Sequence, residues 1–138
     1  MEWHQGEFTI SDDSDRLDRS WIVSHLQQTY WAGNRPAEVI ISSIQKSLCF
    51  GLYREDTQIG FARVVTDEHT FAYLCDVYVA VEHRGNGLGT WLVQTVLEHS
   101  LVKPANVKLL GTQDAHGLYQ KFGFGPTTER FMIKRGSS

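Results

Sequence analysis

The sequence feature that most constrains the fold is a glycine-rich segment, Arg84-Gly85-Asn86-Gly87-Leu88-Gly89. An apolar, β-branched stretch precedes it, and apolar residues recur at helical spacing after it. Glycines let the backbone approach a ligand, and the free N–H groups and dipole of a following helix face negative charge. Such a loop can also be a plain chain reversal. Three glycines at alternate positions between a strand and a helix favour an anion-binding site.

Two common nucleotide-binding motifs do not match this segment. A Walker P-loop requires Gly-Lys-Ser/Thr, whereas Gly89 is followed directly by Thr90. A dinucleotide-binding loop starting at Gly85 requires glycine or alanine at Thr90 and an acidic residue about 20 residues further on. The stretch 105–110 contains no acidic residue. The preceding strand also comes late in the chain instead of opening a βαβ unit.

The rest of the pattern predicts one α/β domain spanning residues 1–138, a length typical of single domains. Ser14 or Asp15 is expected to cap a first helix that runs to about Tyr30, and Asn34 a second helix with Pro36 in its first turn. Strands are predicted at 8–10, 48–53, 59–65, 71–81, 107–110 and 129–134, and further helices from 88 to about 99 and at 115–122. This order of elements indicates a mixed sheet.

Composition and spacing exclude several classes of protein. A net charge of −3 argues against a sequence-independent nucleic-acid binder, and no apolar run approaches the about 18 residues of a membrane span. The six histidines show no close ligand spacing, so no metal site is predicted. Cys49 and Cys75 lie in apolar segments and are expected to be reduced thiols, as in the cytoplasm.

The stretch from Val77 to Gly89 closely resembles the acetyl-CoA signature of the GNAT superfamily of N-acetyltransferases, Gln/Arg-x-x-Gly-x-Gly/Ala. Arg84, Gly87 and Gly89 occupy its defining positions. A second stretch, 115–124, is similar to the late "A…LY…GF" motif of the family. The resemblance covers nearly the whole chain. It implies a GNAT-like acyl-CoA N-acyltransferase fold, in which helices flank a mixed, mostly antiparallel sheet.

The resemblance implies acetyl-CoA as the acyl donor. In this family the strand before the loop lends backbone groups to the pantetheine arm, and the loop amides hold the pyrophosphate. The strands at 71–81 and 107–110 are expected to splay apart around the thioester, whose carbonyl a backbone N–H near Val79 would polarise. The expected cofactor-binding residues are Val77, Tyr78, Val79, Arg84, Gly85, Asn86, Gly87, Leu88, Gly89, Thr90 and Thr112, the last at a position where the family often has asparagine.

Two residues are predicted to be catalytic. Tyr119 corresponds to the family tyrosine that protonates the departing CoA thiolate, and its alternative is ordinary aromatic packing. Polyamine-acetylating relatives carry a Glu-Asp pair where this chain has Cys75-Asp76. Asp76 is expected to act as a general base or to bind the acceptor's ammonium group, and the alternative is a salt-bridge partner. Cys75 is expected to be an inert thiol, with a covalent acyl-enzyme as the alternative.

The acceptor is expected to be a primary amine on a small molecule that attacks the thioester directly in a ternary complex. Tyr30 and Trp31 could form a lid or a cation–π wall, or pin a helix end into the core. Arg63 could bind an acceptor carboxylate or pair with a neighbour in the sheet. A peptide or protein lysine acceptor and a non-catalytic acyl-CoA-binding sensor are the alternatives. No nucleic-acid or membrane partner is expected, and a homodimer is left open.

Overall fold

The computed structural model describes residues 1–112, 115–127 and 130–136. Its centre is a six-stranded sheet whose strands lie in chain order: β1 (Glu2–Gln5), β2 (Phe8–Ser11), β3 (Leu48–Arg54), β4 (Thr57–Thr66), β5 (Phe71–Val79) and β6 (Val107–Leu110). All neighbouring strands are antiparallel except β5 and β6, which are parallel. The sheet is therefore mixed and mostly antiparallel, as predicted.

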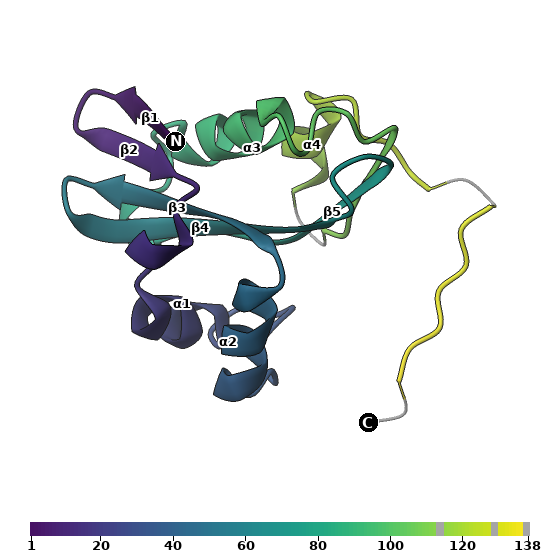
Figure 1. Ribbon diagram of the computed structural model, residues 1–138, viewed down its shortest axis with the longest axis horizontal. Helices are drawn as coiled ribbons and strands as arrows, with labels where there is room; N and C mark the ends of the chain where they lie inside the picture. Colours follow the sequence, from purple (N-terminus) through teal and green to yellow (C-terminus); the bar gives the residue numbers. More distant parts are fainter. Residues whose placement is uncertain (113–114, 128–129, 137–138) are drawn as a thin grey trace.

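Helices cover both faces of this sheet (Figure 1). The helices α1 (Arg19–Leu26) and α2 (Ala37–Gln45) lie on one face, and α3 (Leu88–Glu98) lies on the other, with the short α4 (His116–Gln120) near its end. Each face has its own apolar core. The α3-side core includes Leu74, Val79, Leu88, Leu92 and Val96, and the α1–α2-side core includes Ile22, Leu26, Ile40, Ile44, Phe61 and Tyr78.

The first helix starts later and ends earlier than the sequence predicts. Ser14–Arg16 forms only a 3-10 turn, which Asp13 caps by accepting from the Asp15 N–H. The α-helix begins after Asp18, whose carboxylate accepts from the Trp21 N–H at 3.0 Å. Three acidic residues and a serine within six positions offer competing caps, and tertiary packing selects among them. The N-cap predicted at Asn34 is also wrong, because Pro36 occupies the N-cap position of α2.

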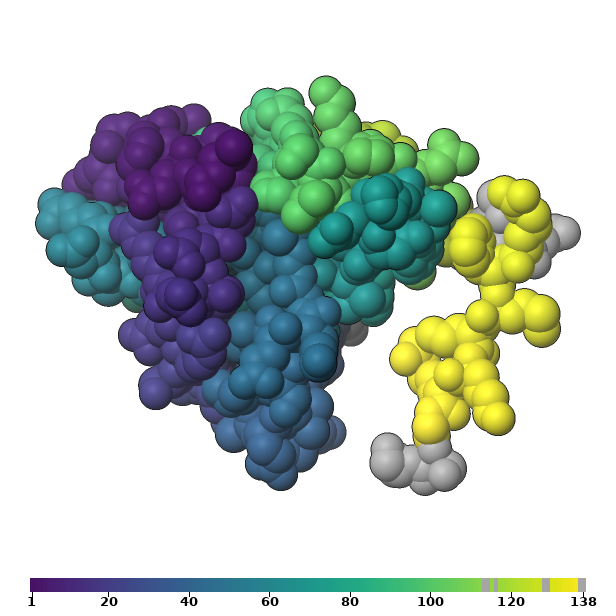
Figure 2. Space-filling view, in the orientation of Figure 1, coloured from purple at the N-terminus to yellow at the C-terminus, as the bar shows by residue number. Residues whose placement is uncertain are grey.

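Residues 130–134 do not form the predicted final strand. They run outward from the body of the molecule (Figures 1 and 2), and no strand among the described residues pairs with them. Phe131 is half-exposed, and Met132 and Ile133 are largely exposed. An alternating apolar pattern indicates a strand only if a partner edge is available, and the pattern alone does not supply one. Residue 129, where this prediction began, lies outside the described residues.

A change of register in β5 decides which face its side chains reach. Arg63 of β4 pairs with Asp76, but Val64 pairs with Leu74, so Cys75 is an extra residue. Before this bulge Leu74 faces the α3-side core, and after it Tyr78 faces the α1–α2-side core. Without the bulge, residues 74 and 78 would share a face, because side chains alternate along a strand. The bulge therefore turns Asp76, which pairs with Arg63, toward α1 and α2.

Candidate active site

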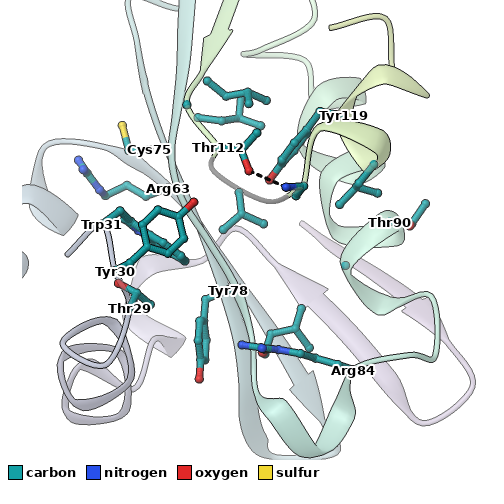
Figure 3. Close-up of a pocket in the computed structure, with 18 of the residues that line it drawn as sticks. Thr29, Tyr30, Trp31, Arg63, Cys75, Tyr78, Arg84, Thr90, Thr112 and Tyr119 are labelled. Carbon is teal, nitrogen blue, oxygen red and sulfur yellow. Dashed lines mark hydrogen bonds between the residues drawn. The ribbon is translucent and has the colours of Figure 1, made fainter. Parts of the chain in front are cut away.

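The strands β5 and β6 pair over a short distance and then separate. Their register runs from Phe71–Val107 to Leu74–Leu110, whereas β5 continues to Val79 with no further partner on that side among the described residues. A cavity of about 1410 Å³ opens at this point (Figure 3). It exceeds the about 300–1,000 Å³ of ordinary small-ligand pockets. The cavity therefore lies where β5 runs on past the end of β6, which is where the sequence predicts that the two strands splay apart.

The glycine loop borders this cavity through the first turn of α3. Gly85 and Gly87 have positive φ angles of 84° and 77°, which favour glycine. The first helical hydrogen bond runs from the Trp91 N–H to the Gly87 carbonyl at 3.0 Å. The preceding N–H groups, those of Leu88, Gly89 and Thr90, thus have no acceptor within the helix. The turn holds no acidic residue, so it presents donors and the positive dipole end to the cavity.

The fold does not require a glycine at position 89. Its φ is not positive, and a Cβ there would touch only Val79 Cγ2, at an ordinary 3.9 Å. The absence of a side chain therefore leaves room in front of the first-turn amides for a ligand. These residues fit the pyrophosphate of a coenzyme, because an anion must come close to the backbone to accept from them.

Arg84 fastens the loop to the end of β5. Its Nε donates to the Val79 carbonyl at 2.8 Å, and its guanidinium lies 5.2 Å from the ring centre of Tyr78. The side chain therefore supports the loop and keeps a positive charge beside the cavity, which it lines.

Tyr119 and Thr112 line the cavity on the other side of β5 from Tyr30, Trp31 and Arg63 (Figure 3). The Tyr119 ring packs edge-on against Phe124, with centroids 6.0 Å apart. The Thr112 hydroxyl accepts from the Ala115 N–H at 3.1 Å and so helps to begin α4. The late motif thus brings a phenol to the cavity, in the region where β6 leaves β5.

A match to a family model decides the classification of the chain. The model described as "Acetyltransferase (GNAT) family" matches residues 2–124. The chain belongs to the GNAT family of acetyltransferases. The match spans both the glycine loop and the motif around Tyr119, and it agrees with the resemblance found in the sequence.

Relatives of this GNAT acetyltransferase support the assignment. "Putative acetyltransferase FG08082" of Gibberella zeae is 33% identical over 84% of this chain and 78% of its own length. The crystal structure of "a putative acetyltransferase belonging to the GNAT family" from Xanthomonas campestris pv. campestris superposes with a TM-score of 0.90. That protein is 38% identical, over 96% of each chain. A GNAT acetyltransferase from Elizabethkingia anophelis with acetyl-CoA bound shares the fold, with a TM-score of 0.69 and 18% identity over 90% of this chain and 80% of its own.

Asp76 lies behind the part of the cavity wall that Trp31, Arg35 and Arg63 form. It is fully buried, and its Oδ2 accepts from Arg63 Nε at 2.8 Å and from Arg35 Nη1 at 3.1 Å. Its Oδ1 accepts from the Trp31 indole N–H at 2.9 Å. A carboxylate with these partners and no exposed surface is poorly placed to receive an acceptor's ammonium group. The geometry favours the other role expected from the sequence, that of a salt-bridge partner.

Arg63 is held on two sides. Its Nε meets Asp76, and its Nη1 donates to the Ser47 hydroxyl at 3.0 Å. Burial by itself lowers the pKa of Arg63, but the hydrogen bond and the charge of Asp76 outweigh that effect and leave the pKa above its ordinary value. Arg63 therefore stays a cation at the wall of the cavity.

Tyr30 and Trp31 stand beside this cluster, at the cavity rather than in the core. Their rings meet edge to face with centroids 5.0 Å apart, and both line the cavity. Because Asp76 holds the indole nitrogen, the Trp31 ring is fixed in orientation. The arrangement favours the predicted wall over a helix end pinned into the core.

Sequence reasoning missed Arg35. Its partner Asp76 lies 41 positions further along the chain, and no local pattern links them. A signal did exist, since Arg35 closes the connection 30–35 between the two predicted helices, which also holds Tyr30 and Trp31. In the described residues, no group of three or more His, Cys, Asp or Glu side chains is arranged to hold a metal ion. No helix within the same residues is long and apolar enough to cross a membrane.

Proposed function

We propose that this GNAT protein transfers the acetyl group of acetyl-CoA to a primary amine of a small molecule, by direct attack in a ternary complex. The observation that carries the proposal is one cavity that joins the glycine loop, the open edge of β5 and Tyr119. The acetyl-CoA bound to the Elizabethkingia anophelis relative supports this choice of donor. The first-turn amides of α3 would hold the pyrophosphate, and backbone groups of Val77–Val79 the pantetheine arm.

The chemistry needs one bond formed, one bond broken and two proton transfers. The neutral amine nitrogen bonds to the thioester carbon while the Val79 N–H stabilises the developing oxyanion, and the carbon–sulfur bond then breaks. Tyr119 gives its phenolic proton to the departing sulfur, and solvent restores it. No Asp, Glu or His is among the described residues that line the cavity, so we assign the amine's proton to water. Asp76 then acts by holding Arg35, Arg63 and Trp31 in place.

Tyr119→Phe should lower kcat by about 10²-fold, in the range of general-acid contributions, because the ring keeps its packing but loses its proton. Acetyl-CoA affinity should not change. Steady-state release of CoA thiol measures the first effect and calorimetry the second. Tyr73→Phe removes a different phenol from the cavity wall and serves as the control, with little effect expected. Undiminished turnover in Tyr119→Phe, with chemistry rate-limiting, would exclude the tyrosine from the mechanism.

Cys75→Ser should retain most of the activity. Burial raises the pKa of the Cys75 thiol, so little of the nucleophilic thiolate exists near neutral pH, which disfavours an acyl-enzyme. Thiol release by the variant is the measurement, and abolished turnover in a folded variant would instead favour a covalent intermediate.

Cys49 and Cys75 are both free thiols, and on that ground we place the reaction in the reducing cytoplasm.

A screen of amines for release of CoA thiol tests the proposed function. Small amines should be acetylated, and mass spectrometry should find the acetyl group on nitrogen. Lysine peptides in the same screen test the alternative acceptor. Tight acetyl-CoA binding without turnover of any amine would favour the acyl-CoA-binding sensor.

A further inference from the structure

The lining of the cavity is positively charged, whereas the net charge of the whole chain is negative. The chain carries a net charge of −3, yet no Asp or Glu is among the described residues that line the cavity. Among the residues that the structure describes, four arginines line it, namely Arg35, Arg63, Arg84 and Arg135. A cavity with this lining attracts anions and repels cations.

Two of these arginines share a single carboxylate. Arg35 and Arg63 both donate to Asp76, so the cluster of three holds one uncompensated positive charge. Both side chains keep some exposure, 24% for Arg35 and 11% for Arg63, whereas Asp76 has none. The negative partner is thus on the protein side of the cluster and the surplus positive charge is on the cavity side. A partly buried surplus cation is costly without a counter-charge.

The guanidinium groups also keep donors for a ligand. Among the described residues, Asp76 and Ser47 occupy Nε and Nη1 of Arg63, and Asp76 occupies Nη1 of Arg35. Within the same residues, the Nη2 of Arg63 and the Nε and Nη2 of Arg35 are left to donate to a ligand. A guanidinium presents its donors in a planar fork that matches a carboxylate or a phosphate.

The position of the pair points to the acceptor rather than to the coenzyme. Arg63 lies opposite Asp76, and Val79, next to the expected thioester, is three residues further along β5. At strand rise this is about 10 Å. In Figure 3, Arg63 lies with Tyr30 and Trp31, whereas Arg84 lies near the glycine loop.

The geometry points to an acceptor amine that also carries a carboxylate or a phosphate, bound by Arg35 and Arg63 while its amine reaches the thioester. This inference rests on the proposed function and names its substrate class. It reverses the expectation from sequence that Asp76 binds the acceptor's ammonium group, because two arginines cover that carboxylate on the cavity side.

Matched acceptors test the inference by kcat/KM for CoA thiol release. The carboxylate arm compares 4-aminobutyrate with its amide, the phosphate arm compares O-phosphoethanolamine with ethanolamine, and 1,4-diaminobutane represents cations. One anionic acceptor should exceed its neutral partner by about 10- to 100-fold, the range of charge-assisted hydrogen bonds. The arm that shows this preference identifies the anionic group. Equal rates in both arms, or the diamine as the best acceptor, would overturn the inference while leaving the proposed function intact.

Substitutions of arginines test which residue produces the preference for anionic acceptors. Arg35→Gln should remove most of the anion preference, through KM for the acceptor, and leave KM for acetyl-CoA unchanged. Arg35→Lys should keep part of it, because the charge remains without the planar fork. The exposed Arg54, which pairs with Glu7, supplies the control Arg54→Gln, with no change expected. A raised KM for acetyl-CoA alone in folded Arg35→Gln would assign the arginine to the coenzyme and overturn the inference. Absence of thiol release from every amine, with acetyl-CoA still bound, would overturn the proposed function itself.

Discussion

Gly89→Glu should weaken acetyl-CoA binding by about 10³-fold while the protein stays folded. A glutamate in the first turn of α3 would put bulk and negative charge where we expect the pyrophosphate, and like charges brought together cost several kcal/mol. The same change should not harm the fold, because a Cβ at this position meets only an ordinary contact. Replacing a helical glycine and adding an acidic group at a helix N-terminus both stabilise a helix. Calorimetric titration with acetyl-CoA and a thermal melt measure the two effects.

Gly89→Gln is the matched control, since it adds nearly the same volume without the charge. Its affinity should fall between those of the wild type and Gly89→Glu, and the difference between the two variants gives the electrostatic part. Gly87 is less suitable, because its φ of 77° would strain any side chain. Wild-type acetyl-CoA affinity in folded Gly89→Glu would contradict the assignment of the loop to the pyrophosphate.

Asp76→Ala should lower the free energy of unfolding by about 3–5 kcal/mol, as expected when one partner of a buried ion pair is removed. The change leaves Arg35 and Arg63 facing each other without their shared counter-charge and frees the Trp31 indole N–H. Partial exposure of Arg35 lets water compensate in part, so we expect the lower end of this range. Urea unfolding followed by circular dichroism measures the loss.

Glu7→Ala is the control for this experiment, because it removes an exposed ion pair instead of a buried one. Glu7 pairs with Arg54, and both side chains are about half exposed, so its removal should cost less than about 1 kcal/mol. If Asp76→Ala were as stable as Glu7→Ala but lost acceptor turnover alone, Asp76 would be a substrate-facing residue after all. A residue that positions others should instead give a large loss of stability, together with a loss of turnover for all acceptors.

The local patterns of the sequence predicted much of the fold. The glycine loop followed by α3 and the meander of β3, β4 and β5 are continuous in sequence, so periodicity and turn residues identify them. The start of α1 was wrong, because several neighbouring residues can cap a helix and only packing selects Asp18. The strand at 129–134 was predicted from its pattern, which does not reveal whether a partner edge exists.

The candidate site, like the fold, was predictable from the sequence only in part. Tyr119 and the loop glycines reach the cavity as their motifs predict. The surroundings of Asp76 were not predictable locally, because they come from two other segments: Trp31 and Arg35 lie in the connection between α1 and α2, and Arg63 lies on β4. A residue's own segment can show that a carboxylate is buried, but it does not show which cations neutralise it.

The extra residue in β5 makes the face that Asp76 occupies independent of the amino acid at position 75. If Leu74 kept its place and the alternation ran regularly through Cys75, Asp76 would share the α3 face with Leu74, away from Arg35. Deleting Cys75 would instead put Asp76 directly after Leu74 and leave it opposite Arg63, so the buried ion cluster could still form. Substitutions at position 75 keep the register as well. Among related acetyltransferases, the amino acid aligned with Cys75 should therefore vary, and a single gap there should not accompany loss of the Asp76–Arg35 pair.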